Sequence, residues 1–311
     1  ERVRGCSFDV GVFTNLSQDH LDFHPDVASY LAAKAKLFRL LEPERAGKQY
    51  AVLNADDPAS RELARVTRVP VYTYGFKEKA DVRAEKLKLG TTGSVLEVLW
   101  PGGRRELELK LTGGFNVANA LAAWTVGWQE GIAPELVARA LGEVTGVPGR
   151  FERVEAGQDF TVVVDYAHTP DGLANVLEAA RAITPGRLIL VFGCGGDRDR
   201  GKRPQMGAIA ARQSDLTIIT SDNPRSEDPE QIIAEILAGF LAVRRERYLV
   251  EPDRYQAIAR ALEMARAGDL VLIAGKGHET YQILADRVIP FDDRQVVRAL
   301  LRGSGDAGNH G

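Results

Sequence analysis

Short apolar runs alternate with longer amphipathic stretches in the second half of the chain. The runs are the length of strands and occupy residues 160–164, 188–192, 216–220, 247–250 and 270–274. The intervening stretches have the length and periodicity of helices and occupy residues 172–183, 203–212, 230–241 and 254–267. Because strands that alternate with helices build parallel sheets, this half is predicted to be a doubly wound, Rossmann-like α/β domain.

The first half has a similar alternation that is interrupted by a hairpin. Strand-like runs at 10–16, 51–54 and 69–74, with a helix expected at 30–41, predict a mostly parallel sheet. Segments 95–99 and 107–111 then alternate in polarity around Pro101-Gly102-Gly103, which predicts an attached antiparallel hairpin. Helices are expected at 116–129 and 134–144.

Glycine and proline at residues 146–149 separate the two halves. We therefore expect two α/β domains, residues 1–148 and 149–303. Residues 304–311 are small and polar, and are expected to form a disordered tail.

Composition excludes several classes of protein. The 311 residues are 44% hydrophobic and 27% charged, with a formal net charge of -3, as in a soluble globular protein. We expect no nucleic-acid partner, and no apolar run is long enough to insert into a membrane. The two cysteines, Cys6 and Cys194, suit a reducing cytoplasm. The expected state is a cytoplasmic monomer.

Three polar loops follow strands of the predicted second domain. They are Asp222-Asn223-Pro224-Arg225, the charged loop at 196–203, and Gly275-Lys276-Gly277-His278-Glu279. Ligands bind at the carboxyl ends of strands in open α/β sheets, so we expect these loops to converge. Arg198, Arg225 and Glu279 together complement a zwitterion that carries a carboxylate. The alternative is that each loop is an ordinary turn.

A further segment at a strand end and one of these loops suggest nucleotide or anion binding. In Asp165-Tyr166-Ala167-His168-Thr169-Pro170, an aromatic ring, an imidazole and a carboxylate could line a nucleotide pocket. Residues 196–203 nearly match a P-loop but end in Arg203, which has no hydroxyl for Mg²⁺. We reject this segment as the nucleotide loop. Its amides and Arg198 could still bind an anion, or the segment could be a solvated run of charges.

A metal site is possible in the first half. Asp19-His20-Leu21-Asp22 places an imidazole beside carboxylates, which can bind a divalent cation. Lys34 follows on a predicted helix and, taken alone, is a surface lysine.

Taken in order, these segments and several others resemble the motifs of Mur ligases. The further segments are Thr14-Asn15-Leu16, Ala32-Ala33-Lys34, Gly114-Phe115-Asn116-Val117-Ala118-Asn119 and Gly149-Arg150-Phe151-Glu152. The resemblance covers nearly the whole chain. It implies the later part of the family's central ATPase domain, followed by its complete C-terminal ligase domain.

The resemblance implies ATP-dependent amide formation through an acyl phosphate in peptidoglycan precursor synthesis. It is strongest to the branch that adds meso-diaminopimelate to UDP-N-acetylmuramoyl-L-alanyl-D-glutamate, the muramoyl-dipeptide substrate. Arginine at position 225 favours diaminopimelate over lysine, because lysine lacks the second carboxylate and would leave a buried guanidinium unpaired.

The resemblance also implies roles for individual residues. Lys34 is expected to be carbamylated by CO₂ and to support Mg²⁺ together with the metal ligand His20, and Arg2 to contact the muramoyl peptide. The expected ATP-binding residues are Asn116, Arg150, Asp165 and His168. The expected diaminopimelate-binding residues are Arg198, Asp222, Asn223, Pro224, Arg225, Gly275 and Glu279.

The family's uridine-nucleotide domain, its P-loop and a Mg²⁺-binding glutamate segment have no counterpart in the 311 residues. We therefore expect this chain to be inactive alone. The alternatives are a lysine-adding or other Mur ligase, a folylpolyglutamate-type synthetase, and a non-catalytic module that binds an amino acid.

Overall fold

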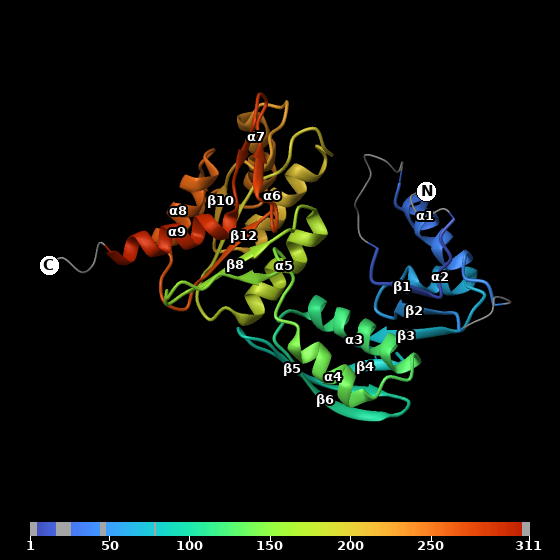
Figure 1. Ribbon diagram of the computed structural model, residues 1–311. Coiled ribbons are helices and arrows are strands. Elements are labelled where there is room, and N and C mark those ends of the chain that lie inside the picture. The colour runs from blue at the N-terminus through green and yellow to red at the C-terminus, as the bar shows by residue number, and fades with distance from the viewer. Residues whose placement is uncertain (1–4, 17–25, 44–47, 78, 307–311) are drawn as a thin grey trace. The chain divides into compact units, whose positions relative to one another are not determined.

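The computed structural model describes residues 5–16, 26–43, 48–77 and 79–306. The chain divides into two compact units, Glu1–Thr145 and Gly146–Gly311, which we call the first and second units. Each unit has its own six-stranded sheet (Figure 1). Buried hydrophobic residues form two clusters in the first unit and a further cluster in the second. No helix in the described ranges is both long and apolar enough to cross a membrane.

The sheet of the first unit is parallel at one side and antiparallel at the other. Its strands occur in the order β1-β2-β3-β4-β5-β6. Strands β1 to β4 are parallel, with bounds Val10–Phe13, Tyr50–Asn54, Val71–Gly75 and Val82–Leu89. The antiparallel strands β5 (Ser94–Trp100) and β6 (Gly103–Leu109) form the predicted hairpin. The mostly parallel sheet with an attached hairpin is thereby confirmed.

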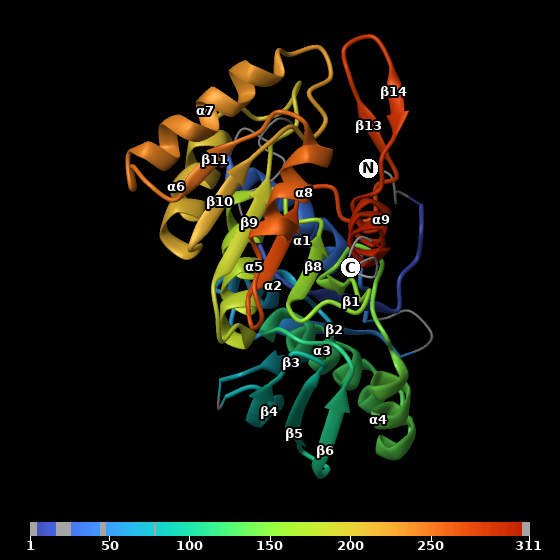
Figure 2. The same cartoon turned by 90° about the vertical axis from the view of Figure 1, so that its left-hand side faces the viewer.

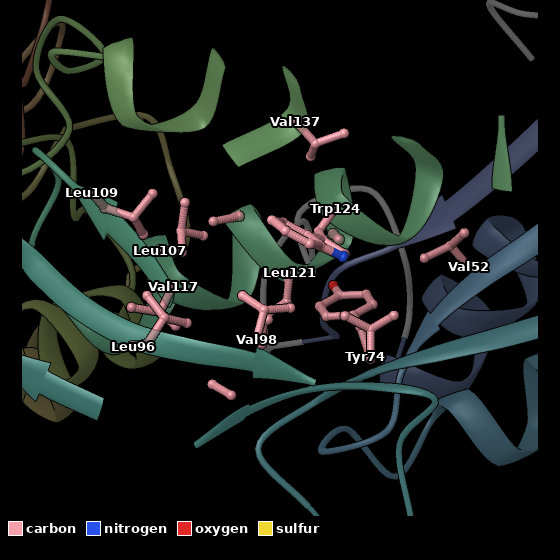
Figure 3. Packing of buried hydrophobic residues seen from close by; sticks show 14 of the residues in the cluster. Val52, Tyr74, Leu96, Val98, Leu107, Leu109, Val117, Leu121, Trp124 and Val137 are labelled. Atoms are coloured by element: carbon pink, nitrogen blue, oxygen red, sulfur yellow. The ribbon is translucent and has the colours of Figure 1, made fainter. Parts of the chain in front are cut away.

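Strand β2 explains how this sheet has two covered faces. Ala51 and Leu53 are buried in a core shared with helices α1 (Val27–Arg39) and α2 (Ser60–Val66). Tyr50 and Val52 point to the opposite face and belong to the core formed with α3 (Gly114–Gln129) and α4 (Pro134–Glu143). Figure 3 shows this second core, where Leu121 and Trp124 lie near Val98 and Tyr74.

The second unit contains the predicted doubly wound sheet. Its strand order is β11-β10-β9-β12-β8-β7, and all neighbours are parallel except β7 and β8. The bounds of β7 to β12 are Glu152–Arg153, Thr161–Asp165, Leu188–Phe192, Leu216–Ile219, Tyr248–Val250 and Leu270–Ala274. Strands β9 and β12 are buried along their whole length, which explains their continuous apolar sequences.

Helices cover both faces of this sheet. Helices α5 (Pro170–Ile183), α6 (Lys202–Gln213) and α7 (Pro229–Leu241) lie on one face. Helices α8 (Arg254–Met264) and α9 (Asp293–Asp306) lie on the other (Figures 1 and 2). This arrangement confirms the Rossmann-like class. Helix α9 continues into the segment predicted to be a tail, and residues 307–311 lie outside the described ranges.

A second hairpin, which the sequence pattern did not predict, follows β12. Strands β13 (Tyr281–Ile283) and β14 (Val288–Pro290) pair antiparallel and stand apart from the main sheet (Figure 2). Each strand has three residues, too few to produce a recognisable alternation.

A buried ion pair fixes the carboxyl ends of two strands in the second unit. Arg254 and Asp293 are 1% and 0% exposed, and two 2.8 Å hydrogen bonds join the guanidinium to the carboxylate. Arg254 also donates to the carbonyls of Ser221 (3.3 Å) and Ala274 (3.1 Å). One side chain therefore ties the end of β10 to the end of β12.

Arg254→Met should destabilise the second unit strongly. Removing one partner leaves the Asp293 carboxylate buried without a counter-ion, which costs about 3–5 kcal/mol of unfolding free energy. We expect the urea midpoint measured by far-UV circular dichroism to fall. Tryptophan fluorescence supplies an internal control, because Trp100, Trp124 and Trp128 all lie in the first unit.

The double variant Arg254→Met/Asp293→Asn removes the stranded charge and should recover part of the loss. A single variant with the wild-type midpoint would contradict a stabilising role for the pair.

Candidate active site

Four loops of the second unit meet at one edge of its sheet. They follow β10, β9, β12 and β8, which are neighbours in that order. Because these strands are parallel, their carboxyl ends share an edge. The structure brings together the loops at 222–225, 193–201, 275–279 and 165–170.

Arg225 joins the loop after β10 to the loop after β9. Its Nη1 donates to the carbonyl of Gly196 at 2.8 Å, and the Gly196 amide donates to the carbonyl of Asn223 at 2.9 Å. Arg225 has a left-handed backbone, with φ of 53°, and its amide donates to the carbonyl of Ile283 at 3.1 Å. Its Nε and Nη2 make no hydrogen bond to residues the structure describes, so both remain available to a carboxylate.

Asn223 joins the same loop to the loop after β12. Its Nδ2 donates to Oε2 of Glu279 at 2.8 Å, and its Oδ1 accepts from the Ile283 amide at 2.9 Å. Lys276 also donates to this Oδ1, at 3.2 Å, and to Oε2 of Glu279, at 3.0 Å. The amide and the carboxylate are therefore held in fixed orientations beside Arg225.

Asp222 lies beneath this network. It is 6% exposed, and burial raises the pKa of its carboxyl group, although the positive charges of Arg254 and Lys276 oppose that shift. A Cβ on Gly275 would lie 2.4 Å from Asp222 Oδ2, and Gly275 has a φ of 117°. Only glycine suits that position, so Gly275 lets the two loops approach. The Asp222 carbonyl accepts from Nε2 of Gln282 at 2.7 Å.

Ion pairs and hydrogen bonds to carboxylates hold the loop at 193–201. Arg203 is fully buried and pairs with Glu227 and Glu235. The Asp197 amide donates to Oε1 of Glu227 at 2.6 Å. Arg203 therefore has a structural role: it is buried and is not part of a solvated run of charges. Arg198 is exposed on this loop, beside the loop that carries Arg225.

The loop after β8 forms a second cluster with the turn at 149–151. Asp165 accepts from the amides of Phe151 and Ala167, both at 2.7 Å, and burial raises the pKa of its carboxyl group despite these bonds. The guanidinium carbon of Arg150 lies 4.7 Å from the centre of the Tyr166 ring.

Two histidines flank the same tyrosine. The Tyr166 ring centre lies 4.6 Å from that of His168 and 5.1 Å from that of His278. Gly149 makes this packing possible, because its φ is 68° and a Cβ there would lie 2.0 Å from the His278 amide nitrogen. Arg150, Tyr166 and His168 thus form a cluster of one guanidinium and two rings, next to the buried Asp165 carboxyl group.

The remaining predicted residues belong to the first unit. Lys34 lines a cavity of about 610 Å³ together with Thr14 and Asn15, and its Nζ lies 4.6 Å from the centre of the Tyr30 ring. Asn116, near the start of α3, donates to the carbonyl of Thr112 at 2.8 Å. Arg2 and His20 lie outside the described ranges. Among the described residues, no group of three His, Cys, Asp or Glu side chains could hold a metal.

Sequence reasoning missed several residues that build the site. Lys276 lies in the predicted loop between the predicted site residues Gly275 and Glu279, so its position in the sequence indicated that it lies near the site. Gln282 belongs to the unpredicted hairpin and had no signal. Arg254 and Asp293 lie 39 residues apart, and no local pattern pairs them.

Comparison with known proteins agrees with this geometry. Residues 1–127 match the family described as Mur ligase middle domain, and residues 149–277 match the family described as Mur ligase, glutamate ligase domain. The chain belongs to the Mur ligase family. The first matched segment contains the cavity around Lys34. The second contains the loops at 165–170, 193–201 and 222–225, and the loop at 275–279 as far as Gly277.

Curated relatives extend the match over nearly the whole chain. The UDP-N-acetylmuramoyl-L-alanyl-D-glutamate–2,6-diaminopimelate ligase of Syntrophomonas wolfei is 52% identical over 97% of this chain. The ligase of the same name from Geobacillus kaustophilus is 49% identical over 98%. In both comparisons this chain spans 62% of the relative's length.

Solved structures give the same family. A ligase of that name is 36% identical and superposes with a TM-score of 0.64, covering 98% of this chain and 62% of the other. The folylpolyglutamate synthase of Mycobacterium tuberculosis shares only the fold, with 21% identity and a TM-score of 0.70 over 96% of this chain and 64% of its own.

Proposed function

We propose that the protein is a Mur ligase that joins meso-diaminopimelate to UDP-N-acetylmuramoyl-L-alanyl-D-glutamate at the expense of ATP. Relatives with that printed name are about half identical over 97–98% of the chain, which supports the assignment. The observation that carries it is the group Arg225, Asn223 and Glu279, which lie together at one sheet edge. A guanidinium beside a carboxylate complements an amino-acid end group.

We place the far end of diaminopimelate in this group. Its carboxylate would accept from Nε and Nη2 of Arg225, and its ammonium would donate to Oε1 of Glu279, atoms without a hydrogen bond to the described residues. Arg198, on the adjacent exposed loop, would add a second positive charge. Asp222, Pro224 and Gly275 would shape the backbone. L-lysine lacks the second carboxylate that Arg225 would bind, so the site would discriminate against it.

The reaction follows the order of bond changes that an acyl phosphate requires. The D-glutamyl γ-carboxylate would attack the γ-phosphorus of ATP, and the bond to ADP would break. The diaminopimelate amine, held near the activated carbonyl, would then form the C–N bond, lose a proton and release phosphate. Arg225, Asn223 and Glu279 would contribute by orienting that amine.

For ATP we propose Arg150, Asp165 and His168, all in the second unit. The proposed ATP-binding role of Asn116, a residue of the first unit, rests on the family resemblance. Arg150 supplies a cation for phosphate, and the Tyr166 ring beside it supplies a flat apolar surface. Asp165 would act by positioning, because its carboxylate already accepts two backbone amides. The proposed contact of Arg2 with the muramoyl peptide rests on the family resemblance.

Mg²⁺ would lower the repulsion between the phosphates and the attacking carboxylate. The described residues do not by themselves fit it, because a protonated lysine cannot be a ligand and no acidic or histidine trio is present among them. We therefore propose that the Lys34 amine adds CO₂, forming an N–C bond and losing a proton, and that this carbamate acts with His20. The free cysteines Cys6 and Cys194 support a cytoplasmic location, and the monomeric state stays a prediction.

Arg225→Ala in the full-length protein tests the acceptor site. We expect kcat/KM for meso-diaminopimelate to fall by about 100-fold or more, because a charged partner of the carboxylate is lost. The KM for ATP should stay near the wild-type value. Phosphate release is the measurement, and Arg212→Ala, an exposed arginine at the end of α6, is the control.

An equal loss of ATP affinity would argue against this role for Arg225. Wild-type phosphate release that responds to L-lysine instead of meso-diaminopimelate would identify a lysine-adding ligase. Amino-acid binding by calorimetry without any phosphate release would identify a non-catalytic module.

Lys34→Ala tests the carbamate. We expect turnover to fall to near background, and small carboxylates such as acetate to restore part of it by replacing the missing anion. Lys36→Ala, an exposed lysine on the same helix, is the matched control. Wild-type turnover in Lys34→Ala would rule the carbamate out.

A further inference from the structure

Lys276 is a buried lysine at the centre of the loop network. It is the second residue after β12, and its side chain is fully buried. Its Nζ donates to Asn223 Oδ1 (3.2 Å), Glu279 Oε2 (3.0 Å) and the Tyr281 carbonyl (2.5 Å). An ammonium has three N–H donors, so the set of acceptors is complete. A buried charge is tolerated only when it is satisfied in this way.

Lys276 determines which way the Asn223 amide points. Asn223 Oδ1 accepts both from Lys276 and from the Ile283 amide. Rotating the amide by half a turn would place its NH₂ group against these two donors. The oxygen is therefore fixed toward Lys276, and Nδ2 is fixed toward Glu279 at 2.8 Å.

Lys276 also determines which Glu279 oxygen is free. Oε2 accepts from both Lys276 and Asn223. Oε1 has no hydrogen bond to the described residues. A carboxylate held by one oxygen presents the other in a defined direction, as the capture of an ammonium requires.

The same lysine anchors the unpredicted hairpin. Its bond to the Tyr281 carbonyl holds the first residue of β13. Two residues later, Ile283 uses its amide to bind Asn223 and its carbonyl to accept from the Arg225 amide. The position of Arg225 thus depends on β13, which Lys276 helps to hold.

We propose that Lys276 is a positioning residue for acceptor selection, which acts by orienting Asn223, Glu279 and Arg225 without touching the acceptor. Its complete burial keeps its ammonium from the ligand. This inference rests on the proposed function, since it concerns the same acceptor site. Lys276 would thus contribute to the preference for a diamino acid with a second carboxylate, although it does not contact that amino acid.

Lys276→Met in the full-length protein tests the proposal. Methionine is similar in length and removes all three hydrogen bonds. We expect KM for meso-diaminopimelate to rise about tenfold or more, as losses of supporting contacts typically do, while KM for ATP changes less than about threefold. The ratio of kcat/KM for meso-diaminopimelate to that for L-lysine should fall toward one.

Arg187→Met is the matched control. Arg187 pairs with Asp269 at 2.6 Å, just before β9 and β12, at the opposite edge of the same sheet. The Arg187→Met substitution removes an ion pair to a buried carboxylate away from the loops, so it should lower stability without changing the substrate ratio. If Lys276 had only a structural role, Lys276→Met would behave like Arg187→Met and would change stability alone. Wild-type values of both KM constants and of the substrate ratio in Lys276→Met would overturn the proposal.

Lys276→Gln covers the case in which Lys276→Met does not fold. Glutamine keeps a donor for Asn223 without a charge, and we expect the same selective rise in KM, smaller in size. An unchanged ratio in folded Lys276→Gln would also overturn the proposal. Failure of the proposed ligase function would give a different result from failure of the Lys276 proposal. In that case the wild-type protein itself would release no phosphate in response to meso-diaminopimelate.

Discussion

The hydrogen bonds of Asn223 connect two loops whose strands are not neighbours. Strand β9 separates β10 from β12, so the loops that follow β10 and β12 can meet only by crossing over the end of β9. Asn223 spans that distance with bonds to Glu279 and Lys276 on one side, and its carbonyl accepts from Gly196 above β9. Asn223 therefore contacts both Glu279, the proposed ammonium partner, and Ile283, whose carbonyl holds the Arg225 amide.

Two glycines allow the loops to approach each other closely. Gly275 allows the carboxylate of Asp222 to lie against the backbone, and Gly149 allows the turn before Arg150 to pack on the loop that carries His278. Below them, the Arg254–Asp293 pair binds the ends of β10 and β12. The ion pair and the close packing of the loops together keep Arg225 in its left-handed backbone conformation. That conformation costs of order 1–3 kcal/mol for a residue other than glycine.

The sequence was sufficient to predict the strands and the edge where the site lies. Periodicity predicts β8, β9, β10 and β12, and the rule that parallel strands end at one edge predicts that Arg225 and Glu279 lie at the same edge. Lys276 could not be recognised in the same way, because a lysine between two glycines predicts an exposed loop unless its three acceptors are known. Gln282 and Asp293 depend on long-range packing, which leaves no local periodic signal. The roles of individual residues came from family resemblance.

The most direct test of the account is a crystal structure of the protein with meso-diaminopimelate bound. We predict that one carboxylate lies within about 3 Å of the Arg225 guanidinium and that the adjacent ammonium lies within about 3 Å of Glu279. Asn223 and Lys276 should keep the bonds they have without ligand. Ligand bound away from the carboxyl ends of β10 and β12, with Arg225 and Glu279 uncontacted, would contradict the account.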